Sequence, residues 1–154
     1  MISIAIIGFG SRGQMFAGYV AKDKNSQLVA IAEPVEASRE NAEKFGLAKE
    51  YRFKTADEFF AQGKIADAVL ICTQDAQHKE MALKALEIGY DILLEKPAAA
   101  NIHDCIEIRD RANALNKKVM LTHVLRYSPF YRYIKQLIID GKLGKIVNIE
   151  QTEN

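Results

Sequence analysis

Three glycines near the start of the chain, Gly8, Gly10 and Gly13, directly follow an apolar run. Their G-x-G-x-x-G spacing is typical of a strand-to-helix turn that cradles the pyrophosphate of a dinucleotide. Gly8 would permit the tight turn, Gly10 the close approach of a phosphate, and Gly13 the packing of the helix on the sheet. Unpaired amides at the start of that helix would attract an anion. An ordinary turn without a ligand has the same pattern, so the glycines alone leave both readings open.

An acidic residue, Glu33, ends the second apolar run, LVAIAE. A carboxylate at this point of a dinucleotide-binding fold accepts hydrogen bonds from a ribose diol. It favours NAD over NADP, because a 2′-phosphate would meet a like charge. Taken alone, Glu33 is equally well read as a solvated loop carboxylate, and S-adenosylmethionine-binding folds also use glycine-rich first turns. The order strand, glycine turn, helix, strand and acid therefore predicts a dinucleotide site more strongly than any one of its parts.

Other polar residues are expected at the same rim of the sheet, because open α/β sheets bind ligands beyond the carboxyl ends of their strands. Thr73 would donate a hydrogen bond to the ribose or phosphate side of the cofactor. His78 stands near a helix start, where a structural hydrogen bond is commoner than catalysis. The expected strand ends are Gly8, Glu33, Cys72-Thr73-Gln74, Glu95-Lys96-Pro97 and His123.

Lys96 is the main candidate for catalysis. It ends the run DILLEK, so its amine is expected where a substrate would meet a nicotinamide. Pro97 restricts Lys96 to extended geometry, which would aim the side chain consistently. An ammonium in a partly desolvated site polarises a carbonyl or helps to move the hydroxyl proton as hydride moves. A solvated lysine at a strand end is the alternative interpretation.

The elements that must position these residues alternate between strand-like and helix-like patterns. Strands that alternate with helices of about 10–15 residues indicate βαβ units, a parallel sheet and right-handed crossovers that cover both faces. The expected fold is therefore a doubly wound α/β domain, a Rossmann fold. A capping box, Thr55-x-x-Glu58, predicts one further helix start. Strands are expected at residues 2–8, 27–33, 50–53, 66–72, 91–95 and 118–122, and longer helices at 11–22, 36–45, 77–88, 101–115 and 128–140.

Composition excludes several other classes of protein. Of the 154 residues, 49% are hydrophobic and 27% charged, which is ordinary for a globular protein with a buried core. The net charge of +1, with dispersed Lys and Arg, predicts neither a nucleic-acid nor a membrane partner. The two cysteines, Cys72 and Cys105, form no CxxC pair, so a reduced, cytoplasmic location is expected. No histidine or cysteine has metal-ligand spacing, and no metal is predicted.

Several motifs together resemble the Gfo/Idh/MocA oxidoreductase family: GFGSRG, Glu33-Pro34, CTQDAQH and Glu95-Lys96-Pro97. The segment HVLRYSPFYRYIKQLIIDGKLGKI resembles the bridge to that family's C-terminal domain. The resemblance implies a Rossmann domain over residues 1–123, then a bridging helix and a first strand over 124–154. The resemblance further implies that the family's second domain, an α/β domain, is missing from this sequence. Members transfer hydride between NAD(P) and a sugar, inositol or related polyol.

The resemblance assigns roles to individual positions. The backbone of residues 9–12 would hold the pyrophosphate and Glu33 the adenosine ribose, while Lys96 would be the catalytic lysine. Arg126 and Tyr127 match a basic–aromatic pair near the family's active site. The implied cofactor-contacting residues are Gly8, Phe9, Gly10, Ser11, Arg12, Gly13, Glu33, Cys72, Thr73, Gln74, His78, Glu95 and Lys96.

Two departures from the family pattern affect the expected site. TQD stands where Thr-Pro-Asn is common, and Val124 where members often carry a polar residue. The family's remaining acid and base residues, often an Asp and a His, belong to the absent domain. This chain alone is therefore expected to bind NAD weakly and to turn over nothing.

Other candidate residues carry less chemistry. Cys105 is expected to pack with Ile102, Ile106 and Leu115 on one helix face, and His103 to face solvent. The aromatic run Tyr127, Phe130, Tyr131 and Tyr133 is expected to cover apolar surface towards the second domain. The strand expected at residues 145–150 needs partners that the sequence does not offer.

Two alternatives to a dehydrogenase remain open. One is a non-catalytic NAD-sensing or interaction module, and the other is a glycosidase that uses NAD transiently. A small-molecule sugar or polyol is the expected partner, and a homo-oligomer is possible.

Overall fold

The chain divides into two units, Met1–Thr122 and His123–Asn154, and the computed structural model describes residues 1–152. Each unit is described by itself. Within residues 1–152, no helix has the length and apolar character that crossing a membrane requires.

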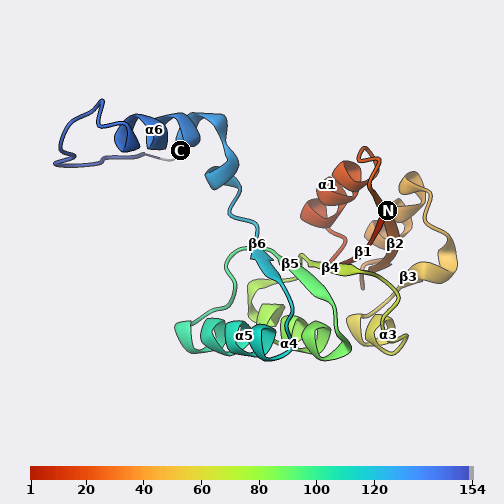
Figure 1. Ribbon diagram of the computed structural model, residues 1–154. Helices are drawn as coiled ribbons and strands as arrows, with labels where there is room; N and C mark the ends of the chain where they lie inside the picture. Colours follow the sequence, from red (N-terminus) through yellow and green to blue (C-terminus); the bar gives the residue numbers. More distant parts are fainter. Residues whose placement is uncertain (153–154) are drawn as a thin grey trace. The chain divides into compact units, whose positions relative to one another are not determined.

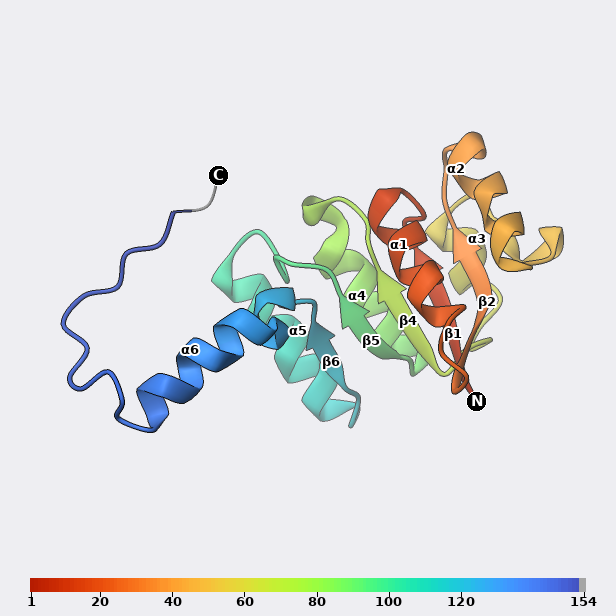
Figure 2. The ribbon, with the colours of Figure 1, turned by 90° about the horizontal axis from the view of Figure 1, so that it is seen from above.

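The first unit is built on a six-stranded sheet in the order β3-β2-β1-β4-β5-β6 (Figures 1 and 2). All of its strand pairings are parallel. The strand order reverses between β1 and β4, which is where doubly wound sheets open a crevice for a ligand. The predicted doubly wound α/β fold is confirmed. The strands are β1 (Ile2–Ile7), β2 (Ser26–Ala32), β3 (Arg52–Phe53), β4 (Ala68–Ile71), β5 (Asp91–Leu94) and β6 (Val119–Leu121).

Helices cover both faces of this sheet, as right-handed crossovers require. Helix α1 lies on one face, and α3, α4 and α5 lie on the other (Figure 1). Two 3₁₀ segments, Asn41–Phe45 and Lys49–Tyr51, follow the short α2, and a third, Asp75–Gln77, precedes α4. The helices are α1 (Ser11–Val20), α2 (Glu36–Glu40), α3 (Ala56–Phe60), α4 (His78–Ile88) and α5 (Ile102–Ala114).

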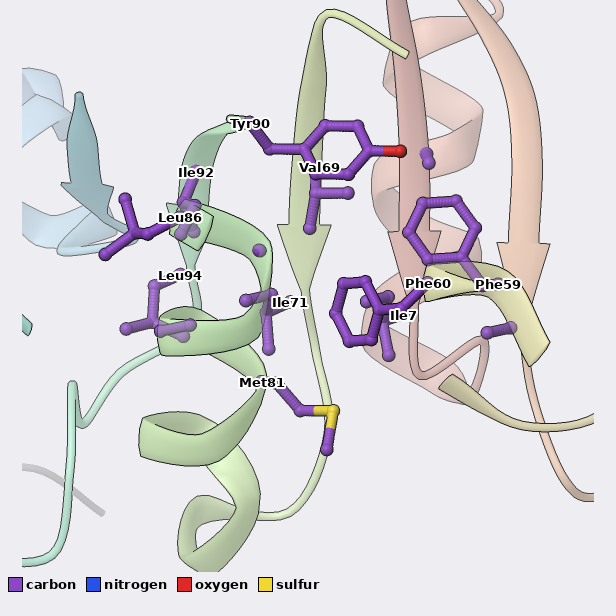
Figure 3. Close-up of a cluster of buried hydrophobic side chains, with 14 of the residues drawn as sticks. Ile7, Phe59, Phe60, Val69, Ile71, Met81, Leu86, Tyr90, Ile92 and Leu94 are labelled. Atoms are coloured by element: carbon purple, nitrogen blue, oxygen red, sulfur yellow. The ribbon is translucent and has the colours of Figure 1, made fainter. Parts of the chain in front are cut away.

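Two apolar cores result from the alternation of strand side chains between the faces. In β1, Ala5 and Ile7 belong to the larger core, whereas Ile6 belongs to the smaller core beneath α1. Figure 3 shows the larger core, where Phe59 and Tyr90 stack with ring centroids 5.8 Å apart. Burial on both faces explains why β1 and β4 are nearly continuous apolar runs in the sequence.

Helix boundaries follow from caps near the predicted positions. Gly89 ends α4 at a φ of 96°, and the Asn101 side chain accepts a hydrogen bond from the Asp104 amide at the start of α5. Thr55 caps α3 by accepting from the Glu58 amide at 3.1 Å. The reciprocal half of the capping box is shifted by one residue, because the Glu58 carboxylate accepts from the Lys54 amide.

Three local predictions are wrong. The helix expected at 36–45 divides into α2 and a 3₁₀ segment, and the first half of the strand expected at 50–53 is a 3₁₀ turn before the two-residue β3. On α5, Cys105 and Leu115 pack against the core as expected, but Ile102 and Ile106 are exposed, and Ile108 and Ala112 are buried instead. Cys105, Ile108 and Ala112 share a helix face at i, i+3 and i+7, and this face turns away from the expected one.

The second unit contains a 3₁₀ turn, Val124–Tyr127, and helix α6 (Pro129–Ile139). Proline opens α6 as predicted, but the Ser128 side chain makes no capping hydrogen bond. Residues 145–150, where a strand is expected, form none. A strand requires a hydrogen-bonded neighbour, and no described segment pairs with these residues.

Candidate cofactor and active site

The three glycines occupy three different environments at the end of β1. Gly8 has a φ of +86°, and a Cβ atom added to it would lie 2.5 Å from the Cys72 carbonyl oxygen on β4's trailing loop. A Cβ on Gly13 would overlap the Gly8 carbonyl oxygen, so only glycine lets α1 pack against the turn. A Cβ on Gly10 would meet nothing within 4 Å. The structure therefore gives each glycine the local geometry that the spacing predicts: the tight turn at Gly8, the open space at Gly10 and the close helix packing at Gly13.

The first turn of α1 presents free amides beside the open space at Gly10. This helix has no side-chain N-cap and no acidic residue in its first turn. Within residues 1–152, the amides of Gly10, Ser11 and Arg12 have no protein acceptor. The Phe9 amide is different, because it donates to Glu33 Oε2 at 2.7 Å. The expectation that Phe9 also offers its amide to a pyrophosphate is therefore wrong.

Glu33 joins the turn after β1 to the turn after β2. It is only 7% exposed, and its second oxygen, Oε1, accepts from the Val35 amide at 2.9 Å. Each carboxylate oxygen retains a further lone pair, so the carboxylate is still able to accept from a ribose hydroxyl. The buried Arg39 guanidinium donates to the Glu33 and Pro34 carbonyl oxygens. The Arg39 guanidinium is thus bonded to backbone carbonyl oxygens and is not exposed to a 2′-phosphate.

The loop after β4 adds a thiol and an unpaired hydroxyl. Burial, reinforced by the nearby Glu95 carboxylate and partly opposed by Arg12, raises the pKa of the Cys72 thiol to about 12. Cys72 is therefore a neutral neighbour of the site and not a nucleophile. Thr73 Oγ1 is buried without a hydrogen-bond partner in the described structure, whereas Gln74 is exposed. A buried unpaired hydroxyl in a crevice is a candidate ligand contact.

Lys96 extends from the end of β5 with its backbone held from the neighbouring strand. Its amide donates to Glu95 Oε2 at 3.1 Å and to Thr122 Oγ1 at 3.3 Å. The side chain is exposed, and among residues 1–152 its amine has no recorded hydrogen bond or ion pair. The Lys96–Pro97 peptide bond is cis. The structure thus presents a free amine from a fixed backbone position.

Glu95 links Lys96 to the glycine turn. Its Oε1 lies 3.5 Å from Arg12 Nε, and this atom is buried without a hydrogen bond in the described structure. Arg12 itself is 47% exposed and belongs to the first turn of α1. The buried Glu95 carboxylate and the half-exposed Arg12 guanidinium therefore connect the end of β5 to the glycine turn after β1.

His78 lies beneath the rim and not on it. It is fully buried, with Nδ1 2.6 Å from the Pro97 carbonyl oxygen and Nε2 3.1 Å from that of Thr73. A side chain without exposed surface has no access to a cofactor, so the expectation that His78 flanks the cofactor directly is wrong. His78 instead contacts the loops after β4 and β5, which do reach the rim.

Two parts of the site are absent from the sequence-based prediction. Thr122, which supports Lys96, ends the expected strand 118–122, and following strand ends to their last residue would have found it. An open cavity of about 260 Å³ lies beside Gly8 and Thr73. Thr55, the first residue of the capping box, is one of the residues that line this cavity. Its further lining residues include Pro34, Lys54, Asp57, Gln77 and Met81.

The second unit contains three of the expected site residues: His123, predicted at the rim, and Arg126 and Tyr127, predicted near the active site. Arg126 and Tyr127 are exposed within that unit. Their place near an active site stays a prediction.

These features define a class of protein. A doubly wound sheet, a glycine turn at the reversal of strand order and an acid after the second strand are the parts of a dinucleotide-binding Rossmann domain. Residues 2–123 match the family described as "Oxidoreductase family, NAD-binding Rossmann fold". The chain belongs to this family, Gfo/Idh/MocA, and its Rossmann domain binds NAD.

Known relatives share this domain at modest identity. The structure of scyllo-inositol dehydrogenase from Lactobacillus casei with bound NAD(H) and scyllo-inositol superposes with a TM-score of 0.84 at 29% identity, covering 94% of this chain and 43% of that one. Glucose-6-phosphate 3-dehydrogenase of Bacillus subtilis is 28% identical over 97% of this chain and 41% of its own length. An α-N-acetylgalactosaminidase of Bacteroides fragilis is 25% identical over 97% and 37%. The chain thus spans less than half the length of the curated relatives it matches.

Proposed function

We propose that this chain is the cofactor-binding part of an NAD-dependent dehydrogenase that acts on a sugar, inositol or related polyol, with Lys96 as its proton-handling residue. The observation that carries the proposal is the Lys96 amine, free on a fixed backbone at the same rim as the glycine turn. The polyol is supported by the inositol dehydrogenase that shares the fold. The remaining substrate contacts would come from a second domain.

The described residues fit NAD. The free amides of residues 10–12 and the open space at Gly10 suit a pyrophosphate. The cavity beside Gly8, with Glu33 and the unpaired Thr73 hydroxyl near it, suits the adenosine half. NAD, when bound, supplies the hydride acceptor.

The chain's own residues would manage the proton that leaves the substrate hydroxyl. The Lys96 amine would accept a hydrogen bond from that hydroxyl and help to remove its proton, and an ammonium there would stabilise developing negative charge on the oxygen. The Glu95 and Thr122 side chains would keep the Lys96 backbone in register during this step. Their role is orientation, since both contact the amide of Lys96 and not its amine.

The test is NADH formation by the full-length protein on a panel of inositols, sugars and sugar phosphates. Lys96→Ala is expected to lower kcat about a hundredfold or more, within the range of general acid–base catalysis. Lys118→Ala is the matched control, because Lys118 is exposed at the opposite end of the neighbouring strand β6. Wild-type-like turnover by Lys96→Ala would contradict the role of Lys96. NAD binding without turnover on any member of the panel would favour a cofactor-sensing module.

A glycosidase that uses NAD transiently is the second candidate, because a relative named as an α-N-acetylgalactosaminidase matches nearly the whole chain. Such an enzyme returns its hydride within each turnover, so it accumulates no NADH. Release of an aglycone from an aryl glycoside without net NADH would favour this candidate over the dehydrogenase.

A further inference from the structure

The buried His78 ring connects the two loops that carry Thr73 and Lys96. We infer that His78 is a positioning residue, which acts through the Pro97 carbonyl to hold Lys96 in the orientation that proton transfer requires. The inference rests on the proposed role of Lys96. His78 begins α4, so the helix that follows β4 supplies a rigid base for a contact to the loop after β5.

The two contacts of the His78 ring indicate which of its nitrogens carries a proton. Both nitrogens face carbonyl oxygens, which only accept, and a neutral imidazole has a single N–H. We assign the proton to Nδ1, because its 2.6 Å separation from the Pro97 oxygen is the shorter of the two contacts. The longer contact, at 3.1 Å from Nε2 to the Thr73 oxygen, is donated as well only when the ring holds a second proton.

This bond completes a clamp around Lys96. On the N-terminal side, the Lys96 amide donates to Glu95 and Thr122. On the C-terminal side, the next residue's carbonyl accepts from His78. Without His78 the segment would be held from one side only, and the exposed amine would sample more positions. Displacement of a catalytic group by about 1 Å costs on the order of a hundredfold in rate.

The burial of His78 separates this role from cofactor or substrate contact. Its ring has no exposed surface, so a substitution removes no direct contact with either ligand. A defect that acts through Lys96 should lower kcat, whereas a defect that acts through the Thr73 loop should weaken NAD binding. The division between kcat and affinity therefore reports which loop matters.

The experiment compares His78→Phe and His78→Gln in the full-length protein. Phe retains a planar ring but donates nothing, whereas Gln keeps an N–H donor. His103→Phe is the control, because His103 is exposed on α5. We expect His78→Phe to lower kcat about ten- to a hundredfold with the NAD Kd changed less than about threefold. His78→Gln should recover part of that loss.

A double-mutant cycle then tests whether the effect passes through Lys96. In a Lys96→Ala background, His78→Phe should lower the residual kcat less than about twofold, because the group being positioned is already gone. Full additivity of the two losses, or a change confined to the NAD Kd, would overturn the inference.

A spectroscopic measurement on the unsubstituted protein needs neither turnover nor a folded variant. In a ¹⁵N-histidine-labelled sample, the His78 Nδ1–H should appear as a proton protected from solvent exchange. An unprotonated Nδ1 would refute the bond to Pro97 even if the enzyme is active. A protected Nδ1–H in a protein that shows no turnover would leave the His78–Pro97 contact intact but count against the proposed function. The claim that this contact positions a catalytic group would then be rejected as well.

Discussion

Gly10 and Gly13 lie three residues apart, yet the same substitution should affect binding at one and folding at the other. Gly10 has φ −71° and ψ −156°, which any residue adopts, and an added Cβ meets no atom within 4 Å. Gly10→Ala should therefore change the free energy of unfolding by no more than about 0.5 kcal/mol. Its methyl group would occupy the space through which a pyrophosphate approaches. Steric crowding of about 1–3 kcal/mol corresponds to NAD affinity about five to 150 times weaker.

Gly13→Ala should destabilise the fold before any ligand is considered. Its Cβ would overlap the Gly8 carbonyl oxygen and lie 3.2 Å from Ile6 Cγ2, so the backbone of α1 or of the turn must shift. Crowding of this kind costs about 1–3 kcal/mol, and the better helix propensity of alanine returns at most about 1 kcal/mol. A net loss of about 1–2 kcal/mol would lower Tm by about 2–8 °C.

Gly18→Ala is the matched control, because Gly18 lies in the same helix and an added Cβ there also meets nothing within 4 Å. This substitution should raise stability by about 0.5–1 kcal/mol. Thermal unfolding followed by circular dichroism and NAD titration by calorimetry would measure all three variants in the full-length protein. NAD affinity of Gly10→Ala equal to wild type would refute the pyrophosphate position. A Gly13→Ala variant as stable as Gly18→Ala would refute the packing argument.

Three further predictions concern single side chains. Glu33→Ala leaves the buried Phe9 amide and the part-buried Val35 amide unpaired, so it should lower the free energy of unfolding by about 1–3 kcal/mol without cofactor and also weaken NAD binding. A variant with unchanged stability in urea without cofactor would contradict this. Burial raises the pKa of Tyr90, so the folded state holds the phenol proton more tightly than the unfolded state does. The free energy of unfolding of the wild type should therefore fall more steeply above about pH 10 than that of Tyr90→Phe. Urea unfolding that gives the two proteins the same pH dependence in this range would refute the prediction. Because the pKa of Cys72 is raised to about 12, Cys72 of the folded protein should resist alkylation by iodoacetamide at pH 8 and become reactive when urea unfolds the protein. Peptide mass spectrometry would detect the alkylated cysteine. Rapid alkylation of Cys72 in the folded protein would refute this prediction.

The fold was predictable because it depends on patterns that survive without tertiary detail. Apolar runs of strand length, helical spacing between them and glycines at turns each report a local requirement of the backbone. The Gly8-x-Gly10-x-x-Gly13 spacing was sufficient to predict the three environments, since each follows from the geometry of a strand entering a helix over a parallel sheet. The positions of Glu33 and Lys96 at the rim of the sheet were predictable for a related reason, because the carboxyl ends of parallel strands lie at one edge.

The remaining site features depend on contacts between side chains far apart in the sequence. The Lys96 amide meets Thr122, 26 residues away, and the His78 ring meets Pro97, 19 residues away. Neither pairing leaves a local signal, because it depends on strand register and on which rotamer a buried side chain adopts. The Phe9 amide shows the same limit, since its capture by Glu33 is a property of two turns brought together by β1–β2 pairing.

These long-range contacts have one feature in common: each joins the carboxyl ends of neighbouring strands. Glu33 joins the loops after β1 and β2, His78 those after β4 and β5, and Thr122 joins β6 to the loop after β5. The polar side chains that make them are nearly buried, so water competes weakly for the hydrogen bonds. A rim joined in this way is ordered before a ligand arrives, which lowers the entropy lost on binding. Among residues 1–152, the groups at this rim that have no protein partner include the first amides of α1 and the Lys96 amine. These are the groups to which the proposed function assigns the ligand.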